Sequence, residues 1–168
     1  NKEDQVDIFG IQWTFEPQSR GSIVIGGNPI LDDVNNWREI IKIPDVDSWD
    51  WEGAAAANKE FCNSGKAIEA VMLNGFGFER LISMMGFVPA AMALLDEEQT
   101  DAIKEMNQAF ADFACKVIDL ECQYFPQMDI INFHDDWGSQ KETFFSPALA
   151  EEMIVPYMRR VTDFLHSK

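Results

Sequence analysis

The stretch Lys66-Ala67-Ile68-Glu69-Ala70-Val71-Met72-Leu73 decides the fold class, because it predicts a strand that begins after Gly65 and ends at an Asn74-Gly75 turn. A second apolar stretch, Met128-Asp129-Ile130-Ile131-Asn132-Phe133, follows Pro126 and has the length and composition of a buried parallel strand. A long helix is expected between them. This order of strand, helix and strand predicts βα units and a mostly parallel sheet.

Helical patterns flank the second of these strands. Asp96-Glu97-Glu98-Gln99 has the form of a capping box and predicts a helix start. Apolar residues then recur at three- and four-residue spacing to about Gln123, as expected for one buried stripe. Ser146-Pro147 predicts the start of a last helix, with Ser as N-cap and Pro at the first helical position. Residues 78–85 are also expected to be helical.

The first third of the chain has a different character, since it is rich in Gly, Asn, Pro and aromatic residues. Residues 8–13 and 22–25 predict two strands of a hairpin around a turn at residues 17–21. A short helix is expected over residues 35–41 and a longer one over residues 48–63. The whole chain is expected to form one domain.

Composition and charge exclude several classes of partner. The formal net charge of the 168 residues is −16, and such a surface repels nucleic acid and anionic lipid headgroups. No apolar run approaches the roughly 20 residues that a membrane helix requires. The chain opens without a basic region or an apolar signal core, so we expect a cytoplasmic protein. Cys62, Cys115 and Cys122 form an odd set without a CxxC pair, which argues against a disulfide framework.

The candidate site lies where the two parallel strands end, because functional groups gather at the carboxyl edge of such sheets. The second edge, Phe133-His134-Asp135-Asp136-Trp137-Gly138-Ser139-Gln140, packs a base, two acids, an indole and an amide together. His134 beside Asp135 and Asp136 is suited to binding a metal, moving a proton or having its pKa raised. The alternative is that one of the acids caps a turn and His134 only fills space.

The first edge, Asn74-Gly75-Phe76-Gly77-Phe78-Glu79-Arg80, is not a dinucleotide fingerprint, because Arg80 stands where the third glycine would be. Glu79 and Arg80 are either a surface pair at a helix start or part of the same site. Asp7 lies in an otherwise apolar segment, where an unpaired carboxylate is costly to bury. Asp7 is therefore expected at an exposed strand end or in a functional role.

Several of these segments resemble one known family. Asp135-Asp136-Trp137-Gly138-Ser139-Gln140, followed by Phe145-Ser146-Pro147 and Val155-Pro156-Tyr157, resembles an acidic-aromatic-glycine segment and two helix starts of the uroporphyrinogen decarboxylase superfamily. Residues 77–87 and Asp7-Ile8-Phe9-Gly10 with Trp13 resemble earlier segments of that superfamily. The resemblance implies a (β/α)8 TIM barrel, which normally takes about 250 residues. We therefore expect an incomplete barrel with an N-terminal β-hairpin, formed by residues 1–168 as a single partial domain.

The resemblance also implies chemistry and site residues. The Asp135-Asp136-Trp137-Gly138 form looks closer to the corrinoid-linked methyltransferases, in which zinc activates a thiol that takes a methyl group from a corrinoid. Zinc and the corrinoid are expected only in a complete protein, and no metal ligands are expected within this chain. The expected partner is a small molecule or a corrinoid protein, and the chain is expected to form a homo-oligomer. The implied catalytic residues are Asp7, His134, Asp135 and Asp136, and the implied substrate-binding residues are Asn74, Glu79, Trp137 and Gln140.

Two other functions stay open from the sequence. The first is decarboxylation of uroporphyrinogen or a similar tetrapyrrole, against which the few arginines and the negative charge count. The second is a non-catalytic binding or scaffold module that associates through an uncovered apolar edge. Since the chain is expected to be only part of a barrel, we expect it to be inactive by itself.

Overall fold

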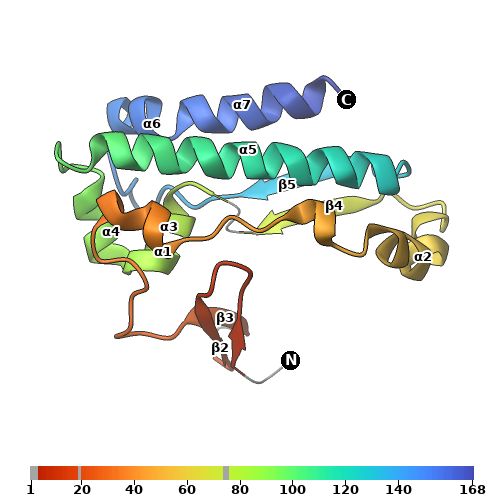
Figure 1. The fold of residues 1–168 in the computed structure, drawn as a ribbon, viewed down its shortest axis with the longest axis horizontal. Helices are drawn as coiled ribbons and strands as arrows, with labels where there is room; N and C mark the ends of the chain where they lie inside the picture. The colour runs from red at the N-terminus through yellow and green to blue at the C-terminus, as the bar shows by residue number, and fades with distance from the viewer. Residues whose placement is uncertain (1–3, 19, 74–75) are drawn as a thin grey trace.

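A computed structural model describes residues 4–18, 20–73 and 76–168 (Figure 1). Two small sheets and a set of helices make up a mixed α/β fold. One long helix crosses the length of the molecule, with a layer of helices above it and the strands beneath. The elements are β1 (Gln5–Val6), β2 (Gln12–Glu16), β3 (Gly21–Val24), η1 (Val34–Asn36), α1 (Trp37–Ile40), η2 (Val46–Ser48), α2 (Trp51–Cys62), β4 (Glu69–Leu73), α3 (Phe78–Met85), α4 (Phe87–Ala93), α5 (Thr100–Tyr124), β5 (Ile130–His134), α6 (Pro147–Met153) and α7 (Val155–His166).

The expectation of a (β/α)8 barrel, even an incomplete one, is wrong. Within the described ranges the strands form a three-stranded antiparallel sheet, β1-β2-β3, and a two-stranded parallel sheet, β4-β5. No pattern of eight β/α units is present among them. The physical reason is that, among the described residues, parallel pairing occurs only after residue 65, between β4 and β5, whereas β1, β2 and β3 pair antiparallel. The residues before that point form a meander and short helices instead.

The N-terminal hairpin is present, but it begins later than predicted. β2 pairs antiparallel with β3, with Trp13 opposite Val24 and Glu16 opposite Gly21. Residues 8–11, which were expected to be strand, form a turn because the Asp7 carboxylate accepts hydrogen bonds from the backbone N–H groups of Phe9 and Ile11. A side chain that captures nearby backbone donors competes with strand pairing.

The long helix α5 organises the core. Phe110 is fully buried and packs edge-on against Phe9, with ring centroids 5.0 Å apart. On the opposite side, Asp112 accepts a hydrogen bond from Arg160 Nε of α7 at 2.7 Å. This pattern confirms the apolar stripe that the sequence predicted.

The start of α5 differs from the capping-box prediction. Asp96 accepts hydrogen bonds from Glu98 N and Gln99 Nε2, which closes a turn ahead of the helix. The side-chain oxygen Oε1 of Gln99 accepts from Val34 N at 2.9 Å instead of completing a capping box. The helix consequently begins at Thr100 rather than beside Asp96. Ser146, by contrast, caps α6 as predicted, although the last helix is divided at Ile154.

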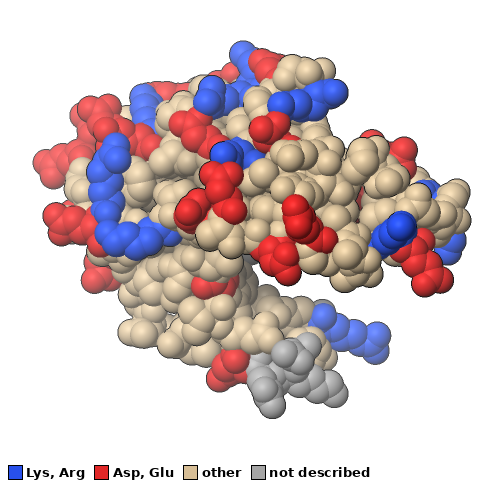
Figure 2. All heavy atoms as spheres, turned by 45° about the vertical axis from the view of Figure 1, so that its right-hand side comes forward, with Lys and Arg blue, Asp and Glu red and all other residues tan. Residues whose placement is uncertain are grey.

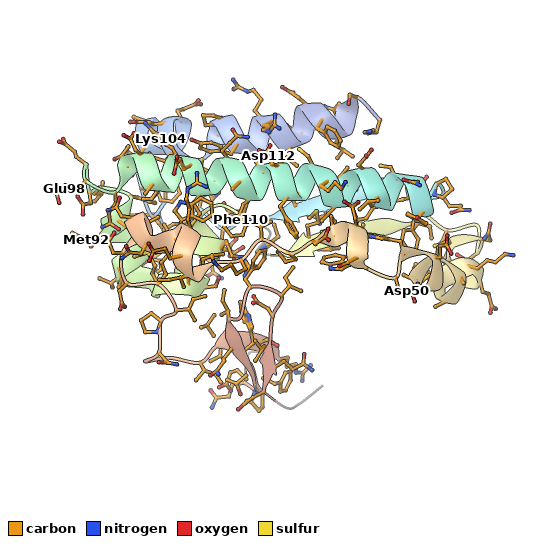
Figure 3. All side chains as sticks on the ribbon, viewed as in Figure 1. Asp50, Met92, Glu98, Lys104, Phe110 and Asp112 are labelled. Carbon is orange, nitrogen blue, oxygen red and sulfur yellow. The ribbon has the colours of Figure 1, made fainter. Side chains whose placement is uncertain are left out.

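Charged side chains are spread over the surface. Figure 2 shows Asp and Glu over much of one face, with Lys and Arg side chains between them. In Figure 3, Lys104 and Asp112 lie on the side of α5 that faces α6 and α7, and Phe110 lies on the other side. No helix in the described part of the chain is both long and apolar enough to cross a membrane.

Replacement of Phe110 by Ala tests the central place of α5. The fully buried ring leaves a cavity when truncated, so we expect a loss of about 3 to 5 kcal/mol in the free energy of unfolding. Phe61→Ala removes a ring that is 58% exposed and is the matched control, with an expected loss below about 1 kcal/mol. Urea unfolding measures both, and equal losses in the two variants would contradict this account of the core.

Candidate functional site

The two parallel strands bring the predicted site residues to one edge. β4 and β5 pair in register, with Leu73 opposite His134. The residues that follow each strand therefore leave the sheet side by side. After β4 the chain enters α3, and after β5 it runs through Asp135 and Trp137. This confirms that two segments far apart in the sequence converge where both strands end.

Asp135 anchors this edge. Its carboxylate accepts hydrogen bonds from Phe78 N at 3.1 Å, Glu79 N at 2.8 Å and Trp137 Nε1 at 2.6 Å. The first two donors belong to the first turn of α3, whose own N-cap residue is Gly77 and offers no side-chain acceptor. Asp135, the residue after β5, thus supplies the capping side chain of α3 and accepts hydrogen bonds from backbone N–H groups that would otherwise be unpaired. Burial, opposed by these hydrogen bonds, raises the pKa of Asp135 to about 6.

Gly77 is required by this arrangement. Its φ of +87° lies in the left-handed region that side chains disfavour. A Cβ atom built on Gly77 would stand 2.3 Å from Oδ2 of Asp135. Only glycine therefore lets the carboxylate reach the start of α3.

Glu79 and His134 form a hydrogen-bonded pair. His134 Nδ1 lies 2.8 Å from Glu79 Oε2, and the Glu79 side chain is 19% exposed whereas that of His134 is 46% exposed. The hydrogen bond and the charge of Glu79 raise the pKa of His134 above its ordinary value of 6.5. Asp136 is more distant, with Oδ1 at 3.8 Å from His134 Nε2 and a side chain 68% exposed. Glu79, predicted as a substrate-binding residue, is therefore also the partner of the predicted base.

Asp7 lies in a second hydrogen-bonded cluster. Arg80 of α3 belongs to this cluster, and the neighbouring Glu79 pairs with His134. Its carboxylate accepts from Arg80 Nη1 at 2.8 Å and from Trp13 Nε1 at 3.1 Å, besides the two backbone donors of its own turn. Burial opposes ionisation, but these hydrogen bonds and the Arg80 charge hold the pKa of Asp7 below its ordinary value. Arg80 is buried, and its guanidinium lies over the Phe9 ring. The pair joins the N-terminal sheet to α3, and a catalytic role of Asp7 stays a prediction.

Two predicted substrate-binding residues are placed differently. Asn74 lies outside the described residues. Gln140 is exposed in the loop between Gly138 and Thr143, which form an isolated β-bridge, and no hydrogen bond among the described residues joins it to Asp135, Glu79 or His134. Their roles stay predictions.

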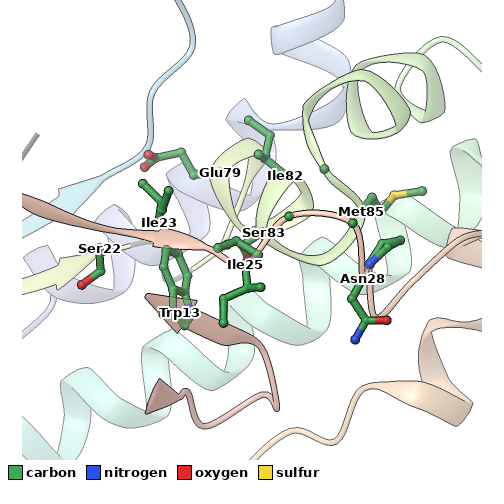
Figure 4. A pocket seen from close by; sticks show the side chains of 14 residues that line it. Trp13, Ser22, Ile23, Ile25, Asn28, Glu79, Ile82, Ser83 and Met85 are labelled. Carbon is green, nitrogen blue, oxygen red and sulfur yellow. The ribbon is translucent and has the colours of Figure 1, made fainter. Parts of the chain in front are cut away.

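A pocket of about 380 Å³ opens between the hairpin and α3 (Figure 4). The chain after β3 is held against α3 because Ile30 N and Leu31 N both donate to Met84 O. Glu79 is the one ionisable side chain among the described residues that line the pocket. The other lining side chains are apolar or small and polar, and include Trp13, Ser22, Ile23, Ile25, Ile82 and Ser83. The sequence pattern gave no sign of this pocket, since its hairpin side consists of ordinary strand and turn residues.

The described residues of the site do not form a metal-binding cluster. Across the described ranges, no cluster of three or more His, Cys, Asp and Glu side chains is placed to hold an ion. All three cysteines are free thiols. What the arrangement offers instead is proton exchange, because a carboxylate and an imidazole share a hydrogen bond at the edge of a pocket.

Comparison of the chain with protein-family models, with curated proteins and with solved structures finds no match. The resemblance to the uroporphyrinogen decarboxylase superfamily therefore stays a prediction from the quoted motifs.

Replacement of Glu79 by Gln tests the proton pair. The variant loses the charge that stabilises imidazolium, so the pKa of His134 is expected to fall back toward 6.5. In the wild type, the raised pKa means that the pair stabilises the fold at pH below 6.5, and that this contribution disappears as pH rises through the folded-state value. NMR titration of the imidazole protons, with His134→Asn for assignment, measures the shift.

The control for this titration is Asp136→Asn, which removes a more exposed and more distant carboxylate. Its effect on the pKa of His134 should be the smaller one. An unchanged pKa in Glu79→Gln, or a larger change in Asp136→Asn, would show that the 2.8 Å pair is absent in solution.

Proposed function

We propose that the chain binds the small-molecule substrate of a methyl-transfer reaction. In this proposal, Glu79 and His134 exchange a proton with the substrate atom that gains or loses the methyl group. The observation that carries it is the double position of Glu79, which lines the pocket and also lies 2.8 Å from His134 Nδ1. A ligand in the pocket is thereby adjacent to a proton path that ends at a half-exposed imidazole.

The lining of the pocket supports one class of substrate. Apolar side chains from Trp13, Ile23, Ile25 and Ile82 favour a mainly hydrocarbon molecule, and Glu79 favours one hydrogen-bond donor on it. A small alcohol, phenol or thiol fits these requirements. Its O–H or S–H proton would pass to the Glu79 carboxylate as the oxygen or sulfur forms its bond to the methyl carbon, while the bond between that carbon and an electrophilic methyl donor breaks and the donor keeps the bonding electrons. In the reverse direction the pair would return the proton to the departing heteroatom.

The cofactors implied by the superfamily are not part of this proposal. The described residues do not fit zinc, because they provide no set of three ligands. A corrinoid is far larger than a pocket of about 380 Å³. No step is derived through either group, and a corrinoid protein stays a predicted partner.

The two alternative functions gain less support. A tetrapyrrole bearing several carboxylates calls for cationic side chains, and no Lys or Arg is found among the described residues that line the pocket. Arg80 is buried and committed to Asp7. For a binding module or a homo-oligomer, the most suitable surface is that of α4, where Val88 is 68% and Met92 is 61% exposed. Self-association stays a prediction.

Binding of phenol and its methyl ether, anisole, tests the proposal. Phenol donates a hydrogen bond to Glu79, and anisole cannot, so we expect phenol to bind roughly tenfold more tightly to the wild-type chain. Glu79→Gln should reduce this preference to about twofold or less, because a neutral amide accepts more weakly than a carboxylate. Titration followed by NMR shifts of the Ile23 and Ile82 methyl groups measures both affinities and locates the ligand.

Asp136→Asn serves as the control variant, because Asp136 is absent from the pocket lining. It should leave the preference for phenol unchanged. If neither compound perturbs Ile23 and Ile82, or if the preference survives in Glu79→Gln, the proposed role of the pocket is wrong.

A further inference from the structure

A second pocket, of about 190 Å³, lies between α2, the start of β4 and the end of α5. Its walls are mostly apolar and include Phe61, Ile68, Phe125 and Met128. Two carboxylates, Glu69 and Glu121, also line it, and no Lys or Arg does so among the described residues. A small apolar cavity with acidic side chains and no cationic one favours a positively charged organic ligand.

Glu69 already has a partner within the protein. Its Oε1 accepts a hydrogen bond from Asn132 Nδ2 at 3.1 Å. The Glu69 carboxylate therefore contributes negative potential to the pocket, but one of its oxygens is engaged.

Glu121 has no such partner. Its Oε2 is shielded from solvent, and no donor in the described part of the chain reaches it. Burial, with no compensating charge or hydrogen bond, raises the pKa of Glu121. Lys168, whose charge acts on the neighbouring Cys122, is paired with Asp119. A carboxylate oxygen that is shielded from solvent and has no donor is costly, and such an atom in a native structure calls for an explanation.

The place of Glu121 on its helix adds to this cost. It stands in the last turn of α5, where the helix presents its partial negative charge. No basic residue occupies that turn. A cation bound beside Glu121 would therefore interact favourably with both the carboxylate and the helix end. The net charge of −16 adds a long-range field that attracts cations.

We propose that this pocket binds a small apolar amine, whose ammonium group pairs with Glu121 while its hydrocarbon part packs against Phe61, Phe125 and Met128. The aromatic side chains add a cation–π contribution to that pairing. This assignment is independent of the pocket that Glu79 lines, since the two pockets share no lining residue.

Three compounds of similar shape test the assignment on the whole chain: benzylammonium, benzyl alcohol and benzoate. Benzylammonium is expected to bind saturably and to shift the Met128 methyl resonance in NMR. Benzyl alcohol should bind at least about tenfold more weakly, and benzoate more weakly still, because it adds a like charge beside Glu121.

Glu121→Gln keeps the size of the side chain and removes its charge. It should weaken benzylammonium binding by about tenfold or more and leave benzyl alcohol unchanged. Glu97→Gln, which removes the same charge from an exposed position outside the pocket, is the matched control and should change little.

Three results would overturn the proposal. The first is equal binding of benzylammonium and benzyl alcohol, and the second is equal weakening in the Glu97→Gln control. The third is the absence of any saturable shift at Met128. None of these outcomes bears on the pocket that contains Glu79, so failure here is distinct from failure of the proposed methyl-transfer site.

Discussion

The hydrogen bonds of the Asp135 carboxylate are the constraint on which the site depends. They tie the residue after β5 to the first turn of α3, which itself follows β4. In the described part of the chain that sheet has two strands, which alone would leave the helix start weakly positioned. The carboxylate supplies the missing cap and fixes the direction in which α3 leaves the sheet. Glu79 is placed beside His134 as a consequence, and Gly77 provides the space.

A second carboxylate, that of Asp7, also holds α3 in place, through Arg80. Asp7 closes the turn before β2 and holds Arg80, the residue next to Glu79. The hairpin is thereby fastened to the same helix that Asp135 caps, and the pocket forms between hairpin and helix. Each of these two partly buried acids is satisfied by several donors, and this offsets the cost of its partial burial. Glu121 is the exception, and its unsatisfied oxygen is the reason to expect a ligand there.

Local patterns predicted local structure well. The apolar stripe of α5, the Ser146 cap and the two parallel strands follow from periodicity and turn chemistry, which act within a few residues. The convergence of Glu79, His134, Asp135 and Trp137 also follows, because parallel strands end at one edge. The prediction of a barrel was wrong, because the order of strands and helices after residue 65 does not determine how many strands join the sheet. The burial of Arg80 and the pocket beside Trp13 depend on contacts across the whole chain, which periodicity does not encode.

Hydrogen exchange in Asp135→Asn is the most direct measurement of the central claim. Asparagine keeps the size of the side chain but offers only one carbonyl oxygen to the three donors that now share two carboxylate oxygens. The amides of Phe78 and Glu79 should then exchange at least about tenfold faster than in the wild type, while the amides at the centre of α5 keep their protection. Unchanged exchange at Phe78 and Glu79 would contradict the claim that Asp135 holds the start of α3.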